Sequence, residues 1–277
     1  MVIRRVGIVS QSSRTKPDEV ARVAAALNQQ VLRDFAPEWD VTATVQVYSR
    51  IREMPFGTWL MLIRDDIHQP GLFGFHRSIQ GLPYAMVQYS HSWSLDASHE
   101  LLEMLADPTG SELEPGLAPG NSFARVEYLR EVCDPCQSEA YSYTINSVLV
   151  SDFITRRYYD TVKSEGVKYS FKGHIRGPRE LLPGGYLTFR RQDTRGGGAQ
   201  WLEWFEGREP RPLEGSPPPG GSVRSWVDRQ TEHPDLCGVP DGSEPLAEAR
   251  RELAEEKTAR EAYAAALEEE IERLLAG

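Results

Sequence analysis

Residues 96–108, with the sequence DASHELLEMLADP, decide how the fold of this chain is interpreted. If the stretch is helical, His99, Glu103 and Asp107 lie on one face, because each follows the previous one by four residues. Glu100 lies about 100° further round the helix axis and reaches the same cleft. The face is therefore either a chemical site or an ordinary acidic helix surface that contains a histidine.

A metal site gives this residue pattern a chemical reason. Two ligands one helical turn apart hold a divalent cation from a rigid backbone, and a neighbouring glutamate takes a proton from the attacking water. Zinc accepts carboxylate oxygen as well as imidazole nitrogen, so Glu103 can stand where a second histidine is more usual. We therefore expect His99 and Glu103 to be metal ligands and Glu100 to be the general base. Zn²⁺ is the expected ion, with Mn²⁺, Fe²⁺ or Ca²⁺ as alternatives, because an added carboxylate favours harder ions.

The residues before this stretch predict a layered core of strands and helices. The continuously apolar run TWLMLIRDD is typical of a strand that is covered on both faces. Alternation and turn residues indicate the other strands. The predicted strands are 2–9, 39–49, 58–66, 71–76 and 83–90, and the predicted helices are 17–35 and 96–107. This order indicates an α/β or α+β fold.

With these elements in place, HELLE at 99–103 resembles the HExxH motif of the zincin metallopeptidases, with glutamate at the last position. The run GLFGFH…LPYAMV…W…SHELLEMLADP…EVCDP…Y…VLVSDF is similar to uncharacterised bacterial zincin-like proteins that carry HExxE, over about residues 1–160. The resemblance implies an α+β fold in which a mixed sheet supports the active-site helix. It also implies an edge strand that pairs with an extended peptide substrate. The implied substrate-binding residues are Gly71, Leu72, Phe73, Gly74 and Phe75.

The third metal ligand stays open in the sequence. The metzincin continuation requires a third histidine or aspartate after a glycine turn, and Asp107 comes two positions too early for it, but its spacing on the helix keeps it among the candidate ligands. A gluzincin-like ligand would be a downstream glutamate, for which Glu131 is the first candidate and Asp134 the next. Cys133 and Cys136 have CxxC spacing, but without a second such pair they are weak evidence for a zinc knuckle.

The residues after the catalytic core are expected to form an extension of that core, followed by a linker and a separate helix. Residues 207–245 are rich in proline, glycine and charge, so too little can be buried there to offset the cost of ordering them. Leucines at heptad spacing in the last segment predict an amphipathic helix over 246–276, which docks on its own core, forms a coiled coil with another copy or binds a partner. The expected units are a zincin-like catalytic core (1–165), a β-rich extension of that core (166–206), a linker (207–245) and a C-terminal amphipathic helix (246–277).

Composition and charge exclude several classes of function. The formal net charge of −10 argues against a general nucleic-acid binder and against docking on an anionic membrane surface. No apolar run is long enough to span a bilayer, and the N-terminal one is too short for a signal peptide, so we expect a cytoplasmic protein. The sequence therefore predicts a metal-dependent hydrolase, a peptidase that acts on peptides or proteins. The alternative is a catalytically inactive zincin-like module that binds or assembles through its C-terminal helix.

Overall fold

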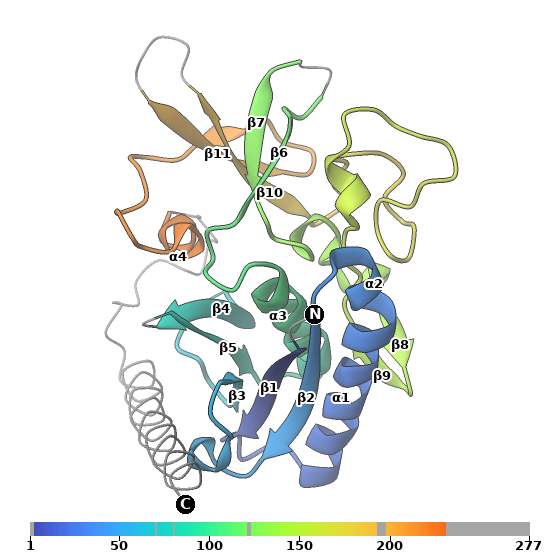
Figure 1. Cartoon of the computed structure of the whole chain (residues 1–277), viewed down its shortest axis with the longest axis vertical. Helices are drawn as coiled ribbons and strands as arrows, with labels where there is room; N and C mark the ends of the chain where they lie inside the picture. The colour runs from blue at the N-terminus through green and yellow to red at the C-terminus, as the bar shows by residue number, and fades with distance from the viewer. Residues whose placement is uncertain (1–2, 70, 80, 121–122, 193–197, 231–277) are drawn as a thin grey trace, which may run out of the picture.

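The structure is a computed structural model that describes residues 3–69, 71–79, 81–120, 123–192 and 198–230 (Figure 1). These residues form two five-stranded sheets, a two-stranded hairpin and a small number of helices. In Figure 1 the second sheet lies at the top of the molecule, the first sheet lies below it, and α3 lies between them. Within the described ranges, no helix is both long enough and apolar enough to cross a membrane.

The first sheet is mixed, and one of its edges is antiparallel. Its order is β2-β1-β3-β5-β4. The strands are β1 (Ile3–Ser10), β2 (Thr42–Tyr48), β3 (Thr58–Arg64), β4 (Gly74–Ile79) and β5 (Leu82–Gln88). The first four in the spatial order run parallel, whereas β4 runs antiparallel to β5 and lies at the edge. The expected edge strand is thus present, but it begins at Gly74 instead of residue 71.

Helices cover one face of this sheet, and a second apolar cluster covers the other. Together they explain why β3 is apolar on both faces. Met61 and Ile63 point into the core shared with the helices, while Leu60 and Leu62 point into a second apolar cluster on the opposite face. The covering elements are α1 (Pro17–Gln29), a π-helical turn η1 (Gln30–Phe35), α2 (Ala36–Trp39) and α3 (Trp93–Ala106). The expectation of a central strand covered on both faces is confirmed.

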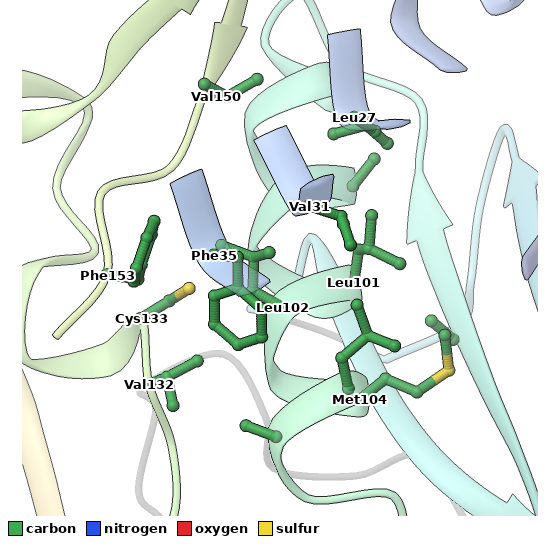
Figure 2. Packing of buried hydrophobic residues seen from close by; sticks show 14 of the residues in the cluster. Leu27, Val31, Phe35, Leu101, Leu102, Met104, Val132, Cys133, Val150 and Phe153 are labelled. Carbon is green, nitrogen blue, oxygen red and sulfur yellow. The ribbon is translucent and has the colours of Figure 1, made fainter. Parts of the chain in front are cut away.

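Helix α3 is held in place by its apolar side. Leu101 and Leu102 point toward Leu27, Val31 and Phe35 of the neighbouring helix, and all five side chains are buried (Figure 2). The helix starts at Trp93, three residues earlier than expected. Because its apolar side is fixed against the core, the side that carries His99 and Glu103 has a defined orientation.

The second sheet is antiparallel throughout and confirms the α+β class. Its order is β12-β11-β10-β7-β6. The strands are β6 (Leu113–Leu117), β7 (Arg125–Leu129), β10 (Tyr186–Gln192), β11 (Ala199–Phe205) and β12 (Arg211–Pro212). The hairpin β8 (Tyr143–Ile145) and β9 (Val148–Val150) packs beside α1 and α3.

The part of the expected linker that the structure describes, 207–230, differs from the expectation. It supplies β12 and the short helix α4 (Val223–Asp228). The buried side chains of α4 share an apolar cluster with β7, β11 and the segment after β12; its members are Leu129, Trp201, Leu213, Val223, Trp226 and Val227. A few large side chains therefore anchor a segment whose overall composition is that of a linker. The expected helix over 246–276 lies outside the described residues.

Candidate metal centre

Helix α3 places its acidic residues as the helical spacing requires. The Nε2 atom of His99 lies 3.2 Å from the Oε2 atom of Glu103, one turn further along the helix. The Glu103 side chain is 1% exposed and that of His99 15%, so the pair is enclosed and not part of a solvated surface. The alternative of an ordinary acidic surface helix does not fit this burial.

The loop after β7 brings an aspartate to the same histidine. The Oδ1 atom of Asp134, at the start of the helical turn η3 (Asp134–Cys136), lies 3.2 Å from His99 Nε2. Ligand atoms at the corners of a tetrahedral zinc site are about 3.3 Å apart, because zinc–nitrogen and zinc–oxygen bonds are close to 2 Å. The backbone N–H of Cys133 donates to Glu103 Oε1 at 3.1 Å, which fixes the second oxygen of that carboxylate. Of the candidates for a third ligand, Asp134 is the one in contact with His99.

Strand β4 contributes a second histidine. His76 is buried, and its Nδ1 atom lies 3.4 Å from Glu100 Oε2 and 3.7 Å from Glu103 Oε2. His76 is not among the ligands expected from the sequence. Alternation along the strand places it on the face opposite Phe75, but the sequence alone does not say which of the two faces α3 covers.

Three overlapping groups of residues in the described part of the chain could hold a metal ion, and all three contain Glu103. The ligand atoms within each group lie within 4.8 Å of one another. The groups are His99 with Glu103 and Cys133, His76 with Glu100 and Glu103, and Glu103 with Glu131 and Asp134; His99 and Asp134, which are in contact, belong to different groups. In addition, His76 Nε2 and Asp134 Oδ1 are buried and make no hydrogen bond of good geometry. Buried polar atoms of this kind are rare, and a bound cation would satisfy an oxygen such as Asp134 Oδ1.

The protonation states follow from burial and from the neighbouring charges. Burial alone would lower the pKa of His99, but the carboxylates of Glu103 and Asp134 outweigh it and raise the pKa well above the usual value. Burial alone would raise the pKa of Glu103, but His99 holds it far below its usual range. Glu131 has no such partner on the helix, and burial raises its pKa well above the usual value. Burial thus disfavours the charged form of Glu131, while Arg224, with its Nη1 atom 3.4 Å from Glu131 Oε1, favours it.

Both cysteines of the CxxC are free thiols. Burial raises the pKa of Cys133 and of Cys136 well above the usual value. Metal ligation by cysteine requires the thiolate, so Cys133 would have to lose its proton to the incoming ion. In the structure its contribution is the backbone N–H that holds Glu103.

Asp107 directly follows helix α3 and has hydrogen-bond partners in the next turn. Helix α3 ends at Ala106, so Asp107 leaves the helical face that the spacing of His99 and Glu103 defines. Its carboxylate accepts hydrogen bonds from the backbone N–H groups of Ser111 and Glu112, both at 2.9 Å. It thus caps the following turn, and it is in none of the three groups of described residues that could hold an ion.

An arginine from α4 reaches the centre. Arg224 Nη1 lies 2.8 Å from Asp134 Oδ2 and 3.4 Å from Glu131 Oε1. Its Nη2 atom donates to the hydroxyl of Tyr186 at 2.6 Å. Arg224 is not among the site residues expected from the sequence, because it lies in the expected linker 207–245 and no local pattern distinguishes it from the other arginines there.

The space for Glu100 depends on a glycine in the edge strand. A Cβ atom on Gly74 would lie 2.7 Å from Cγ of Glu100 and 2.9 Å from its Oε1, closer than such contacts occur. Of the five expected substrate-binding residues, Gly74 and Phe75 are in β4, whereas 71–73 precede it. The carbonyl of Phe73 still accepts from the Gln88 N–H at 2.8 Å, which continues the pairing with β5. Among the described strands, β4 pairs with β5 alone.

Comparison of the chain with protein-family models, with curated proteins and with solved structures found no match. Only the geometry of the site therefore bears on its function.

Asp96, in the first two turns of α3, gives a prediction for stability. Burial raises its pKa from 3.8 to about 6. The folded state therefore binds this proton more tightly than the unfolded state does. As the pH rises through about 6, Asp96 must ionise while buried, and the folded state becomes less stable. We expect Asp96→Asn to raise the free energy of unfolding by about 1 to 2 kcal/mol at pH 7.5, after a reduction for partial exposure, and to have no such benefit at pH 3.5. Urea denaturation of the metal-free protein at both values measures this.

The exposed Asp40 provides the control, since Asp40→Asn removes one carboxylate from the surface of the same protein. An equal effect of Asp96→Asn at the two pH values would contradict the prediction, because it would mean that packing and not ionisation causes the change.

Proposed function

We propose that this protein is a zincin-like, metal-dependent hydrolase in which His99, Glu103 and Asp134 hold a divalent cation and Glu100 acts as general base. One observation carries the proposal. His99 Nε2 lies 3.2 Å both from an oxygen of Glu103 and from an oxygen of Asp134, in an enclosed site that helix α3 and the loop after β7 form together.

The donor set suits a divalent cation. Imidazole nitrogen and carboxylate oxygen are both common zinc ligands. Two carboxylates in the set also leave Mn²⁺, Fe²⁺ and Ca²⁺ as alternatives, because oxygen ligands suit harder ions. A cation at these ligands would supply a Lewis acid and would lower the pKa of a water molecule.

Glu100 is placed to act as the base. Its side chain is 10% exposed and that of Glu103 is 1% exposed, so Glu100 is the more accessible of the two carboxylates. His76 Nδ1 at 3.4 Å holds one of its oxygens, and the glycine at position 74 leaves room for its methylene groups. From this position Glu100 would take a proton from the attacking water and pass it to the leaving group.

The sheet supports a peptide as substrate. The edge strand β4 is antiparallel to β5 and carries His76 next to Glu100, so an extended chain added along β4 would run beside the reacting groups. Main-chain pairing of this kind gives affinity to peptides with different side chains. We therefore propose peptides or unfolded protein segments as the substrate class.

Metal content is the direct test. Plasma mass spectrometry of the tag-free full chain, after exposure to Zn²⁺ or Mn²⁺ and removal of excess ion, is expected to give about one ion per chain. The double variant His99→Ala/Glu103→Ala should contain none. His68→Ala/Asp66→Ala is a matched control, because it removes an exposed histidine–carboxylate pair with a 3.7 Å separation outside the centre.

Two outcomes would reject the proposal. One is that neither the wild-type protein nor the control holds metal when the ion is in excess. The other is that the double variant holds as much as the wild type. If metal is bound, hydrolysis of a mixed peptide library, with cleavage sites read by mass spectrometry, tests the substrate class.

A further inference from the structure

A segment that follows the second sheet contacts the metal centre through Arg224. We call residues 222–228, which comprise α4 and the preceding Ser222, the strap. The backbone N–H of Arg224 donates to the carbonyl of Gly110 at 2.8 Å, and that of Val223 donates to Ser111 Oγ at 3.1 Å. The strap is thereby fastened to the turn that directly follows α3.

The charged side chains of the strap reach both parts of the proposed site. Arg224 binds Asp134 and approaches Glu131, at 2.8 Å and 3.4 Å. Asp228 Oδ2 lies 3.6 Å from Nη2 of Arg77, which belongs to the edge strand β4. The closed strap therefore bridges the metal ligands and the strand beside which a peptide would lie.

We propose that the strap is a built-in inhibitor of the centre: Arg224 and a divalent cation compete for the carboxylate of Asp134, so metal binding and strap closure oppose each other. This inference rests on the proposed function, since it concerns the same metal centre. The guanidinium of Arg224 holds Oδ2 of Asp134 and neutralises the carboxylate, whereas Oδ1 faces His99 and is the oxygen that a cation would take. A cation beside Asp134 would also stand close to a fixed positive charge in a site with little solvent to screen it.

The alternative is that Arg224 orients Asp134 and so assists the cation. Outer hydrogen bonds of this kind do strengthen metal sites. However, Arg224 donates hydrogen bonds to three partners at once, namely Asp134, Tyr186 and Asp228. It is therefore not placed to orient Asp134 alone. Its full charge also remains near the cation, and repulsion between like charges in a buried site opposes binding directly. We therefore expect competition to outweigh orientation.

Opening of the strap gives up the burial of a few side chains, a loss that metal binding would have to offset. The strap is one short helix, held by the three apolar side chains Val223, Trp226 and Val227 and by the polar contacts described above. Lifting it separates Asp228 from Arg77 and uncovers the side of β4 next to the centre. Coupling of this kind is reciprocal, so a cation that weakens the hold of Arg224 makes the strap open more often.

Metal affinity of a strap variant tests the inference. Arg224→Gln in the full chain is expected to bind Zn²⁺ at least about tenfold more tightly than the wild type, in competition with a chromophoric chelator. Arg190→Gln is the matched control, because it breaks an arginine–glutamate pair with a 2.8 Å contact in the second sheet. Val227→Ala, which loosens the apolar anchor without touching a ligand, should change the affinity in the same direction. Circular dichroism verifies that each variant is folded.

Hydrogen exchange of the wild-type protein provides a second readout. Saturating Zn²⁺ is expected to speed exchange of the backbone amides in 222–228 and to slow it in α3. If Arg224→Gln binds Zn²⁺ equally or more weakly while the wild type binds one ion, the inference is wrong and the proposed function stands. If the strap amides are unchanged or slower with Zn²⁺, the inference is likewise wrong. If neither protein binds Zn²⁺, both the inference and the proposed function fail.

Discussion

The variant Glu103→Gln is expected to lose metal affinity by more than about 100-fold, because loss of an outer partner already costs 10- to 100-fold and Glu103 is a direct ligand candidate. It is common to all three groups of residues that could hold an ion. Its Oε2 atom faces both His99 and His76, and its Oε1 atom accepts from the Cys133 N–H. Glutamine keeps the size of the side chain but offers no negative charge.

Isothermal titration with Zn²⁺ measures this loss, and thermal unfolding with and without Zn²⁺ verifies it independently, because an ion that binds the folded state alone raises its stability. Glu203→Gln is the matched control, since Glu203 is another fully buried glutamate, paired with Arg211 at 2.7 Å outside the centre. Retention of wild-type affinity in Glu103→Gln would contradict the prediction and would exclude each of the three ligand groups.

The helical part of the site could be predicted because it depends on local periodicity alone. Spacing of four residues determines that His99 and Glu103 share a face in any α-helix, and the structure has them 3.2 Å apart. The same reasoning fails at Asp107, because the helix ends one residue before it. A helix end is set by capping and by the turn that follows, and these are less regular than the helix itself.

The other residues at the centre could not be derived from spacing, because they arrive through the tertiary fold. His76 faces α3 only because β4 pairs with β5 in one register, and a shift by one residue would turn it to the opposite face. Asp134 and Glu131 were both candidates by their order along the chain. The loop that contains both places only Asp134 against His99.

The second sheet and the strap show why composition misleads over short segments. Residues 207–230 contain enough proline and glycine to resemble a linker, yet Trp226 packs edge-on against Trp201 with ring centres 6.0 Å apart. The free energy of ordering the segment is offset by a few large apolar contacts whose partners are far away in the sequence. The average composition of a window does not contain that information.

The variant Glu100→Gln is expected to lower kcat for peptide hydrolysis by about 10²- to 10⁴-fold, the usual contribution of a general base, and to leave bound metal unchanged. Glutamine occupies the same space beside Gly74 and cannot accept a proton from water. Because Glu100 contacts His76 and not His99, its loss should leave the proposed ligands in place. The separation of the two effects, metal retained and turnover lost, is what distinguishes a base from a ligand.

Steady-state kinetics on a cleaved library peptide, together with metal analysis of the same samples, measures both quantities. The exposed Glu139 offers a control variant, Glu139→Gln, which removes one glutamate charge away from the centre. If Glu100→Gln lost its metal together with its activity, Glu100 would be a ligand, and the group formed by His76, Glu100 and Glu103 would be the occupied one. If it kept both, proton transfer would not depend on Glu100, and Glu131 would be the carboxyl group to examine next, because it is buried beside Glu103 and Asp134 in the same cluster.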